Sequence, residues 1–159
     1  MKVCAHPFGE AHALKCELAA EALRSSGTLK LQVTGWSMLP SIWPGDTLMV
    51  ESVDRHAVSE GDMVLFARDR RLFAHRVVAN HSGDGRLLTR GDAMPAPDLP
   101  ISDGELLGKV SRILRNGRWH EPSRRLRFTE RAVAALVRGS EIGARVVVGL
   151  HGVQQASLE

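Results

Sequence analysis

The stretch from residue 62 to residue 80, DMVLFARDRRLFAHRVVAN, decides the predicted fold. It contains two β-rich runs, DMVLFARD and RLFAHRVVAN, and successive side chains of a strand point to opposite faces of a sheet. In the second run, Phe73, His75 and Val77 therefore share one face, which its apolar members predict to be buried. A histidine in such a place is most often a core residue, so position alone assigns His75 no function.

Further β-rich runs lie on both sides of this stretch. They are LKLQVTG (29–35), DTLMVES (46–52) and ELLGKVSRILRNGRWH (105–120), the last with a hairpin turn predicted at Asn116-Gly117. Segments dense in Gly, Asp and Pro separate the runs and predict loops: WPGD, SEGD, HSGDG and TRGDAMPAPD. The centre of the chain is therefore predicted to be a compact antiparallel β structure.

Helical patterns flank the β-rich centre. Apolar residues recur at helical spacing over residues 11–25, and the pattern stops at Gly27. After Phe128 the pattern is helical again, with Thr129 as the expected N-cap and a break near Gly139. We predict one mainly β domain with an N-terminal helical segment (1–28), a β core forming a coiled antiparallel sheet or partial barrel (29–121), and a basic segment of C-terminal helices (122–159).

Composition narrows the classes of partner. Of the 159 residues 43% are apolar and 25% charged, as in ordinary globular proteins. Aromatic residues make up only 4% and Tyr is absent, so we expect no nucleic-acid partner bound by base stacking. Residues 1–110 carry 12 Lys and Arg against 14 Asp and Glu, a charge of −2, whereas residues 111–159 carry 9 Arg against 4 Glu, a charge of +5. This basic tail favours a solvated face, with an acidic partner or anionic lipid as the alternative.

Other sequence signals are weak. Two cysteines suggest no disulfide framework, and no His/Cys cluster suggests a metal, so neither metal nor cofactor is expected. No run approaches the roughly 20 apolar residues that cross a bilayer. We therefore expect a soluble cytoplasmic protein with at most peripheral membrane contact, while the oligomeric state stays open.

The segment TGWSMLPSIWPGD (34–46) places Ser37 between two large apolar residues, just before two prolines and a Gly-Asp turn. A serine hydroxyl is a poor nucleophile unless a positioned base removes its proton, and histidine suits that task. Ser37 is therefore either an ordinary turn residue or a nucleophile on a rigid corner.

Four segments taken in order decide between these alternatives: GWSMLPSIWPGD, EGDMVLF, AHRVV and LLTRGDAMPAPD. In order and spacing they resemble the type I signal peptidase superfamily, which includes the self-cleaving domains of SOS-type repressors. The first segment matches its Gly-x-Ser-Met-x-Pro motif at Gly35, Ser37, Met38 and Pro40. The resemblance covers about residues 33–110.

The third and fourth segments resemble one branch of that superfamily. Bacterial members place a lysine base where this chain has His75, and a histidine there is typical of the endoplasmic-reticulum and archaeal branch. That branch also has a Thr-Lys-Gly-Asp box followed by a second aspartate. Here the box reads TRGD (89–92), and Asp98 follows Asp92 by six residues.

The resemblance implies a role for each of these residues. Ser37 would attack a peptide carbonyl, and His75 would take its proton and return it to the leaving amine. Asp98 would orient the imidazole, and the alternative is a loop acid beside proline. Asp92 would support the site, either directly or by fixing the loop that presents Asp98.

The resemblance also implies how a substrate binds. The Ser37 N–H would form part of an oxyanion hole, with a second donor still to be identified. Gly35 would permit a positive φ or close substrate approach, whereas Met38 and Pro40 are better explained by packing than by shaping the cleft. A peptide would bind as an added strand, with small residues preferred at the first and third positions before the cut.

The predicted function is therefore that of a soluble serine endopeptidase acting on a peptide or protein. Two alternatives remain: a non-catalytic peptide- or partner-binding module, and a repressor-type self-cleaving domain, which would need an upstream DNA-binding domain and usually a lysine base. Signal peptidases carry a membrane anchor that these residues do not show, which makes a translocon substrate doubtful. The other histidines are expected at the surface: His6, His12, His56, His81, His120 and His151.

Overall fold

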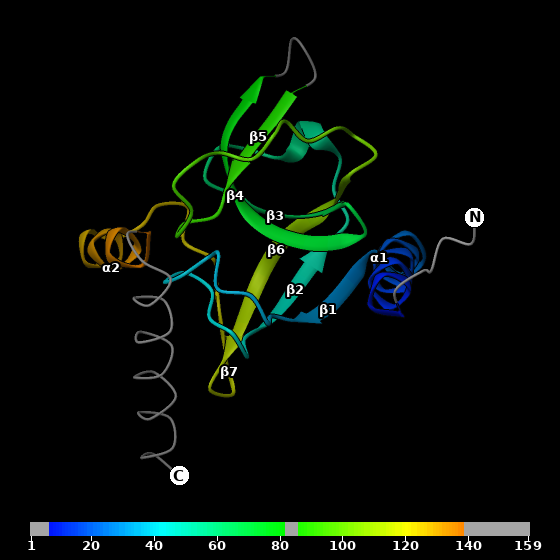
Figure 1. Cartoon of the computed structure of the whole chain (residues 1–159), viewed down its shortest axis with the longest axis horizontal. Coiled ribbons are helices and arrows are strands. Elements are labelled where there is room, and N and C mark those ends of the chain that lie inside the picture. The colour runs from blue at the N-terminus through cyan, green and yellow to red at the C-terminus, as the bar shows by residue number, and fades with distance from the viewer. Residues whose placement is uncertain (1–6, 82–85, 139–159) are drawn as a thin grey trace.

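The computed structural model describes residues 7–81 and 86–138 and has a mainly β fold (Figure 1). Seven antiparallel strands form one sheet that is not closed, which confirms the predicted fold class. The described elements are α1 (Pro7–Ser26), β1 (Thr28–Gln32), β2 (Thr47–Glu51), the 3₁₀ turn η1 (Arg55–Ala57), β3 (Met63–Arg68), β4 (Arg71–His81), β5 (Arg86–Arg90), β6 (Leu106–Arg115), β7 (Arg118–His120) and α2 (Phe128–Arg138).

The strand order is β1-β2-β6-β3-β4-β5, and β7 also pairs with β6. β3 lies inside the sheet, and both of its faces are buried. Met63 and Leu65 join an apolar cluster with Leu48 and Val110, whereas Val64 and Phe66 join a second cluster on the other face. The continuous apolar run of β3 therefore reflects two cores rather than one.

Helix α1 covers the first cluster through Leu23 and runs beside β1 (Figure 1). Gly27 has a φ of 71° and donates its N–H to the Leu23 carbonyl oxygen at 3.0 Å, which ends the helix where the sequence predicted. Within the part of the chain that the structure describes, no helix is long and apolar enough to cross a membrane.

Two Gly-Asp turns lead into strands with the same local geometry. Gly45 and Gly61 have φ values of 95° and 87°, which favour glycine at the third turn position. In each turn the aspartate that follows, Asp46 or Asp62, is buried and accepts a backbone N–H from three residues earlier. Both Gly-Asp pairs are therefore structural turns, and the aspartates hold them closed.

Two local expectations were wrong. The box TRGD was expected in a loop, but Thr89 and Arg90 end β5, because they pair with Val77 and Arg76 of β4. Thr129 was expected as the N-cap, but α2 begins at Phe128. The reason is that the Glu130 carboxylate accepts the N–H of Arg127, the residue just before the helix, at 2.7 Å.

Other local expectations held. The turn at residues 116–117 has positive φ at both positions, as the Asn-Gly pair predicted. The described lone histidines at positions 12, 56, 81 and 120 are exposed, as expected. His6, His151 and the helical break near Gly139 lie outside the described residues.

Candidate active site

Ser37 lies half-buried at the start of a tight corner between β1 and β2. Backbone hydrogen bonds close this corner, from Leu39 N–H to the Trp36 carbonyl at 3.1 Å and from Ile42 N–H to the Met38 carbonyl at 3.0 Å. The side chains of Met38, Leu39 and Ile42 are buried in apolar clusters. The hydroxyl is therefore presented by backbone that the core holds in place.

His75 projects from the middle of β4 toward this corner. Its Nε2 atom lies 3.0 Å from Ser37 Oγ, within the roughly 2.6–3.5 Å that direct proton transfer requires in a site without substrate. His75 is only 4% exposed, and its imidazole contacts the rings of Phe66 and Phe73, at centroid distances of 5.8 and 5.9 Å. This apolar packing fixes the plane of the ring.

Asp98 occupies the other side of the imidazole. Its Oδ2 atom lies 2.7 Å from His75 Nδ1 and accepts the Thr89 hydroxyl at 2.7 Å, while its backbone N–H donates to the Thr89 carbonyl at 2.8 Å. Burial acts to raise the pKa of Asp98, but the hydrogen bonds from His75 and Thr89 and the charges of His75 and Arg68 together bring the pKa below its ordinary value. Asp98 is therefore ionised at neutral pH.

The loop after β5 holds the backbone of Ser37. Ala93 N–H donates to the Ser37 carbonyl oxygen at 2.9 Å. A Cβ atom on Gly91 would lie 2.6 Å from that same oxygen, 2.7 Å from Met94 Cγ and 3.2 Å from His75 Nε2. The fourth segment, LLTRGDAMPAPD, therefore contacts both Ser37 and the imidazole of His75.

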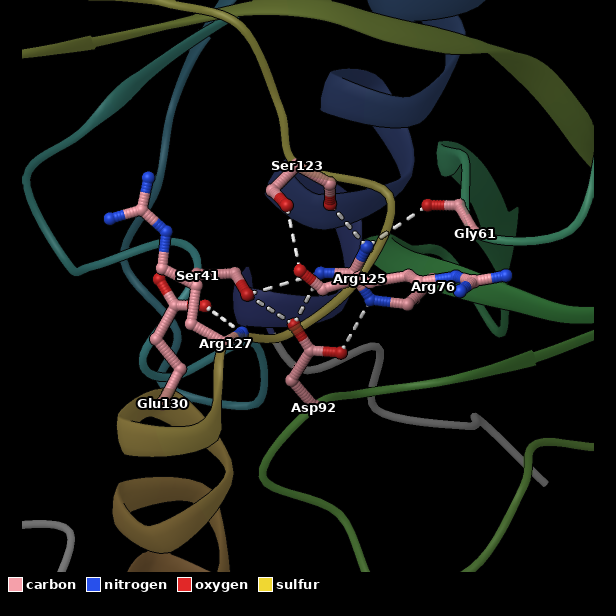
Figure 2. Close-up of polar contacts among 8 residues, drawn as sticks. All are labelled: Ser41, Gly61, Arg76, Asp92, Ser123, Arg125, Arg127 and Glu130. Carbon is pink, nitrogen blue, oxygen red and sulfur yellow. Dashed lines mark hydrogen bonds and ion pairs between the residues drawn. The ribbon is translucent and has the colours of Figure 1, made fainter.

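Asp92 lies in a buried network beside the site (Figure 2). Its two oxygens accept Nε and Nη2 of Arg76, each at 2.8 Å, and it accepts the Ser41 hydroxyl. Arg76 also donates to the carbonyls of Gly61 at 2.9 Å and Ser123 at 2.6 Å. Asp92 thus ties the loop to the corner and to β4, which is the loop-fixing role among the two alternatives.

A second arginine fixes the segment that carries Asp98. Arg68 forms two hydrogen bonds with Glu105, at 2.6 and 3.0 Å, and donates to the carbonyls of Leu99 at 2.9 Å and Pro100 at 2.9 Å. These acceptors directly follow Asp98 in the chain. The position of Asp98 therefore depends on the end of β3 as well as on Thr89.

A family profile described as Peptidase S24-like matches residues 6–111, which include all of these contacts except those of Ser123. The chain belongs to the Peptidase S24-like family. This result supports the resemblance to the signal peptidase superfamily, while the Ser-His branch stays a prediction. A comparison with curated proteins finds no match.

The remaining predicted residues of this S24-like chain fall into two groups. Met38 and Pro40 are buried, and Met38 is part of the main apolar cluster, as the packing interpretation predicted. Gly35 is exposed, has open space where a Cβ would lie, and has no positive φ. Of the two explanations given for Gly35, the one based on backbone conformation was therefore wrong, and close substrate approach stays a prediction.

Sequence reasoning did not find Thr89, Arg68 or Ser41 as supporting residues. Thr89 stood inside a recognised box, but its bond to Asp98 depends on how the loop returns along β5. Arg68 and Ser41 act on segments 31 and 51 residues away in the chain, so no local pattern could indicate them. Among the residues that the structure describes, no group of three or more His, Cys, Asp and Glu side chains could hold a metal ion.

Proposed function

We propose that this S24-like chain is a serine endopeptidase with Ser37 as nucleophile, His75 as general base and Asp98 as the residue that orients the imidazole. The observation that carries the proposal is the continuous line of contacts from Ser37 Oγ to His75 Nε2 at 3.0 Å and from His75 Nδ1 to Asp98 Oδ2 at 2.7 Å. A binding module without catalysis needs no such alignment. The same contacts argue against that alternative.

The chemistry follows from these contacts. Because ionised Asp98 accepts a hydrogen bond, the proton of neutral His75 resides on Nδ1 and the lone pair of Nε2 faces the Ser37 hydroxyl. As Ser37 Oγ attacks the peptide carbonyl carbon, its proton passes to Nε2, and Asp98 stabilises the imidazolium. The imidazolium then protonates the leaving amine as the C–N bond breaks. A water molecule, deprotonated by His75, hydrolyses the acyl-enzyme and releases Ser37.

The negative charge of the tetrahedral intermediate requires hydrogen-bond donors near Ser37. Within residues 7–81 and 86–138, the Ser37 N–H donates no hydrogen bond to the protein. This free donor supports its predicted part in the oxyanion hole. We propose that the substrate approaches along the exposed residues Thr34, Gly35 and Trp36, which precede Ser37 as open backbone beyond β1.

Cleavage of a diverse peptide mixture, followed by mass spectrometry, tests the proposal. Ser37→Ala and His75→Ala should each lower the rate of cleavage roughly 10⁴-fold or more and leave the circular dichroism spectrum unchanged. Ser52→Ala and His120→Ala, which remove an exposed hydroxyl and an exposed imidazole, serve as matched controls and should retain wild-type cleavage. Undiminished activity in either of the first two variants would refute the assignment.

The same purified protein distinguishes cleavage of a second molecule from self-cleavage. We expect added peptides to be cut at a rate proportional to the enzyme concentration, while the chain itself stays intact. Concentration-independent conversion of the intact chain to two fragments, with no cleavage of added peptides, would instead identify the repressor-type alternative.

A further inference from the structure

A second polar site lies on the other face of β4 from His75. Arg76 and Val78 alternate with His75 and Val77 along the strand, so they face away from the proposed catalytic residues. There they line a cavity of about 540 Å³ between β4, the end of β5 and the segment that contains α2. Small-molecule sites commonly have this size.

Positive charge dominates the lining of this cavity. Arg76 is neutralised by Asp92, and Arg124 forms an ion pair with Asp62 at 3.0 Å. Three further lining residues are Arg90, Arg125 and Arg131. Among the described residues, no carboxylate lies within ion-pair distance of these three side chains. The cavity therefore holds about three guanidinium charges that the described protein leaves uncompensated.

The rest of the wall is apolar. Val78, Leu126 and Ala134 complete the lining, and Ala134 is buried against the body of the protein. Apolar walls with convergent polar groups are typical of cavities that hold an organic molecule by one charged end. Arg76 is held in a fixed position in the cavity wall, because all of its donors in Figure 2 are directed to Asp92, Ser41 and two backbone carbonyls.

We propose that this cavity binds a polyphosphate anion, either inorganic or at the end of a small organic molecule. Guanidinium groups present paired donors that match phosphate oxygens, and several arginines around one anion are typical of phosphate recognition. A single carboxylate would offset only one of the three unpaired charges, whereas a di- or triphosphate offsets them all. The basic charge of residues 111–159 favours an acidic partner as one alternative, and this cavity is where such a partner fits.

Much of the cavity lies outside the residues that the family profile matches. Arg124, Arg125, Leu126, Arg131 and Ala134 lie beyond residue 111, where the match ends. These are five of the nine residues that line the cavity. The proposal does not depend on the proposed peptidase function, because none of its anion-contacting residues touches Ser37, His75 or Asp98 in the described contacts.

Isothermal titration calorimetry at constant ionic strength tests the proposal, with pyrophosphate, tripolyphosphate, ADP and citrate as probes. We expect saturable one-to-one binding of the phosphate compounds. Arg90→Gln combined with Arg131→Gln should weaken binding roughly tenfold or more, since each change removes a charge-assisted contact. Arg112→Gln combined with Arg118→Gln removes the same charge from exposed positions outside the cavity, and should change affinity less than about twofold.

The outcomes distinguish an inorganic from an organic phosphate ligand, and they separate phosphate recognition from general attraction of anions. Equal affinity for pyrophosphate and ADP identifies an inorganic ligand, and tighter binding of ADP identifies an organic one. Citrate binding as tightly as pyrophosphate, equal losses in both double variants, no binding at millimolar concentration, or preferred binding of mixed-sequence DNA would each overturn the proposal. If the cavity double variant fails to fold, Arg125→Gln at an exposed position repeats the test. Ser37→Ala should bind the anion as the wild type does.

Discussion

Gly91 lies where only a hydrogen atom fits. Its missing side chain lets the loop after β5 approach the Ser37 carbonyl oxygen, and a Cβ atom there would lie 2.6 Å from that oxygen. The same Cβ would lie 3.2 Å from His75 Nε2. The distance between Ser37 Oγ and His75 Nε2 therefore depends on Gly91, a residue without a side chain.

Gly91→Ala should lower kcat roughly a hundredfold, because it forces the Ser37 backbone away from His75 and a displacement of about 1 Å can cost that much. KM should change little, since the exposed approach to Ser37 is untouched. Steady-state kinetics on any peptide that the wild type cleaves measures both. Gly104→Ala is the control, because a Cβ there meets open space and the residue has no positive φ. Wild-type kcat in Gly91→Ala would contradict this account.

The sequence pointed to the proposed catalytic residues but not to the residues that support them. Ser37, His75 and Asp98 came from motif order, and the structure brings the three together. Asp92 lies outside this line of contacts, because its partner Arg76 points away from His75 on the same strand, and its own role stays a prediction. A sequence motif does not specify distances between atoms. Gly91 allows the close approach of its loop to Ser37, and Thr89 holds Asp98 by a hydrogen bond, so a motif alone does not indicate their effects.

At the scale of elements, β3 connects the sheet to the segment that carries Asp98. Arg68 at its end is 20% exposed and spans Glu105 and the carbonyls of Leu99 and Pro100. Its charge also helps to lower the pKa of Asp98. Arg68 is therefore a positioning residue. It holds the segment that carries Asp98, and Asp98 in turn contacts His75.

Arg68→Gln should lower kcat by about tenfold and raise the pKa of Asp98. The sign follows because the Arg68 charge favours the ionised carboxylate, so without that charge the ionised form is lost at a higher pH as the solution is acidified. Steady-state kinetics measures the rate and an NMR titration of the Asp98 carboxyl measures the pKa; a purely structural role would reduce the rate without moving the pKa. The control is Arg71→Gln, an exposed arginine at the start of β4. An unshifted pKa of Asp98 would count against the electrostatic part of the assignment.

The elements themselves were mostly predictable from alternation and turn residues. β3 and β4 followed directly from the opening stretch, and the hairpin at Asn116 followed from its Asn-Gly pair. β5 was missed because its five residues adjoin Gly- and Asp-rich sequence that resembles loop, while its pairing with β4 is decided by tertiary contact. Helix α2 starts two residues earlier than a Thr129 N-cap implies, because a glutamate, not the threonine, satisfies the first backbone donor.

At the scale of the whole molecule, paired carboxylates join distant segments. Asp46 binds Arg115 of β6, Asp62 binds Lys109 and Arg124, and Glu105 binds Arg68. Hydrogen bonds from Arg68 lower the pKa of Glu105 to about 2, with those of Ser102 adding to the effect and burial opposing it. Asp98 is shifted in the same direction.

The free energy of unfolding should therefore fall as the pH drops below about 4.5 toward 2. A carboxylate with a lowered pKa in the folded state contributes its full stabilisation above the unfolded-state pKa, and loses it as the pH falls through the folded-state value. Urea denaturation at several pH values measures this. Glu105→Gln should flatten the curve in that range, whereas Glu60→Gln, at an exposed carboxylate, should not. A wild-type slope in Glu105→Gln would show that the Arg68 pair contributes nothing.

The bond from Arg76 to the carbonyl of Ser123 spans 47 residues of sequence. Proteins are synthesised from the N-terminus, so Ser37, His75 and Asp98 all leave the ribosome before Ser123 does. The guanidinium that braces the loop around Asp92 consequently lacks one acceptor throughout that interval. A nascent chain thus acquires its fully supported geometry only after residue 123 has left the ribosome.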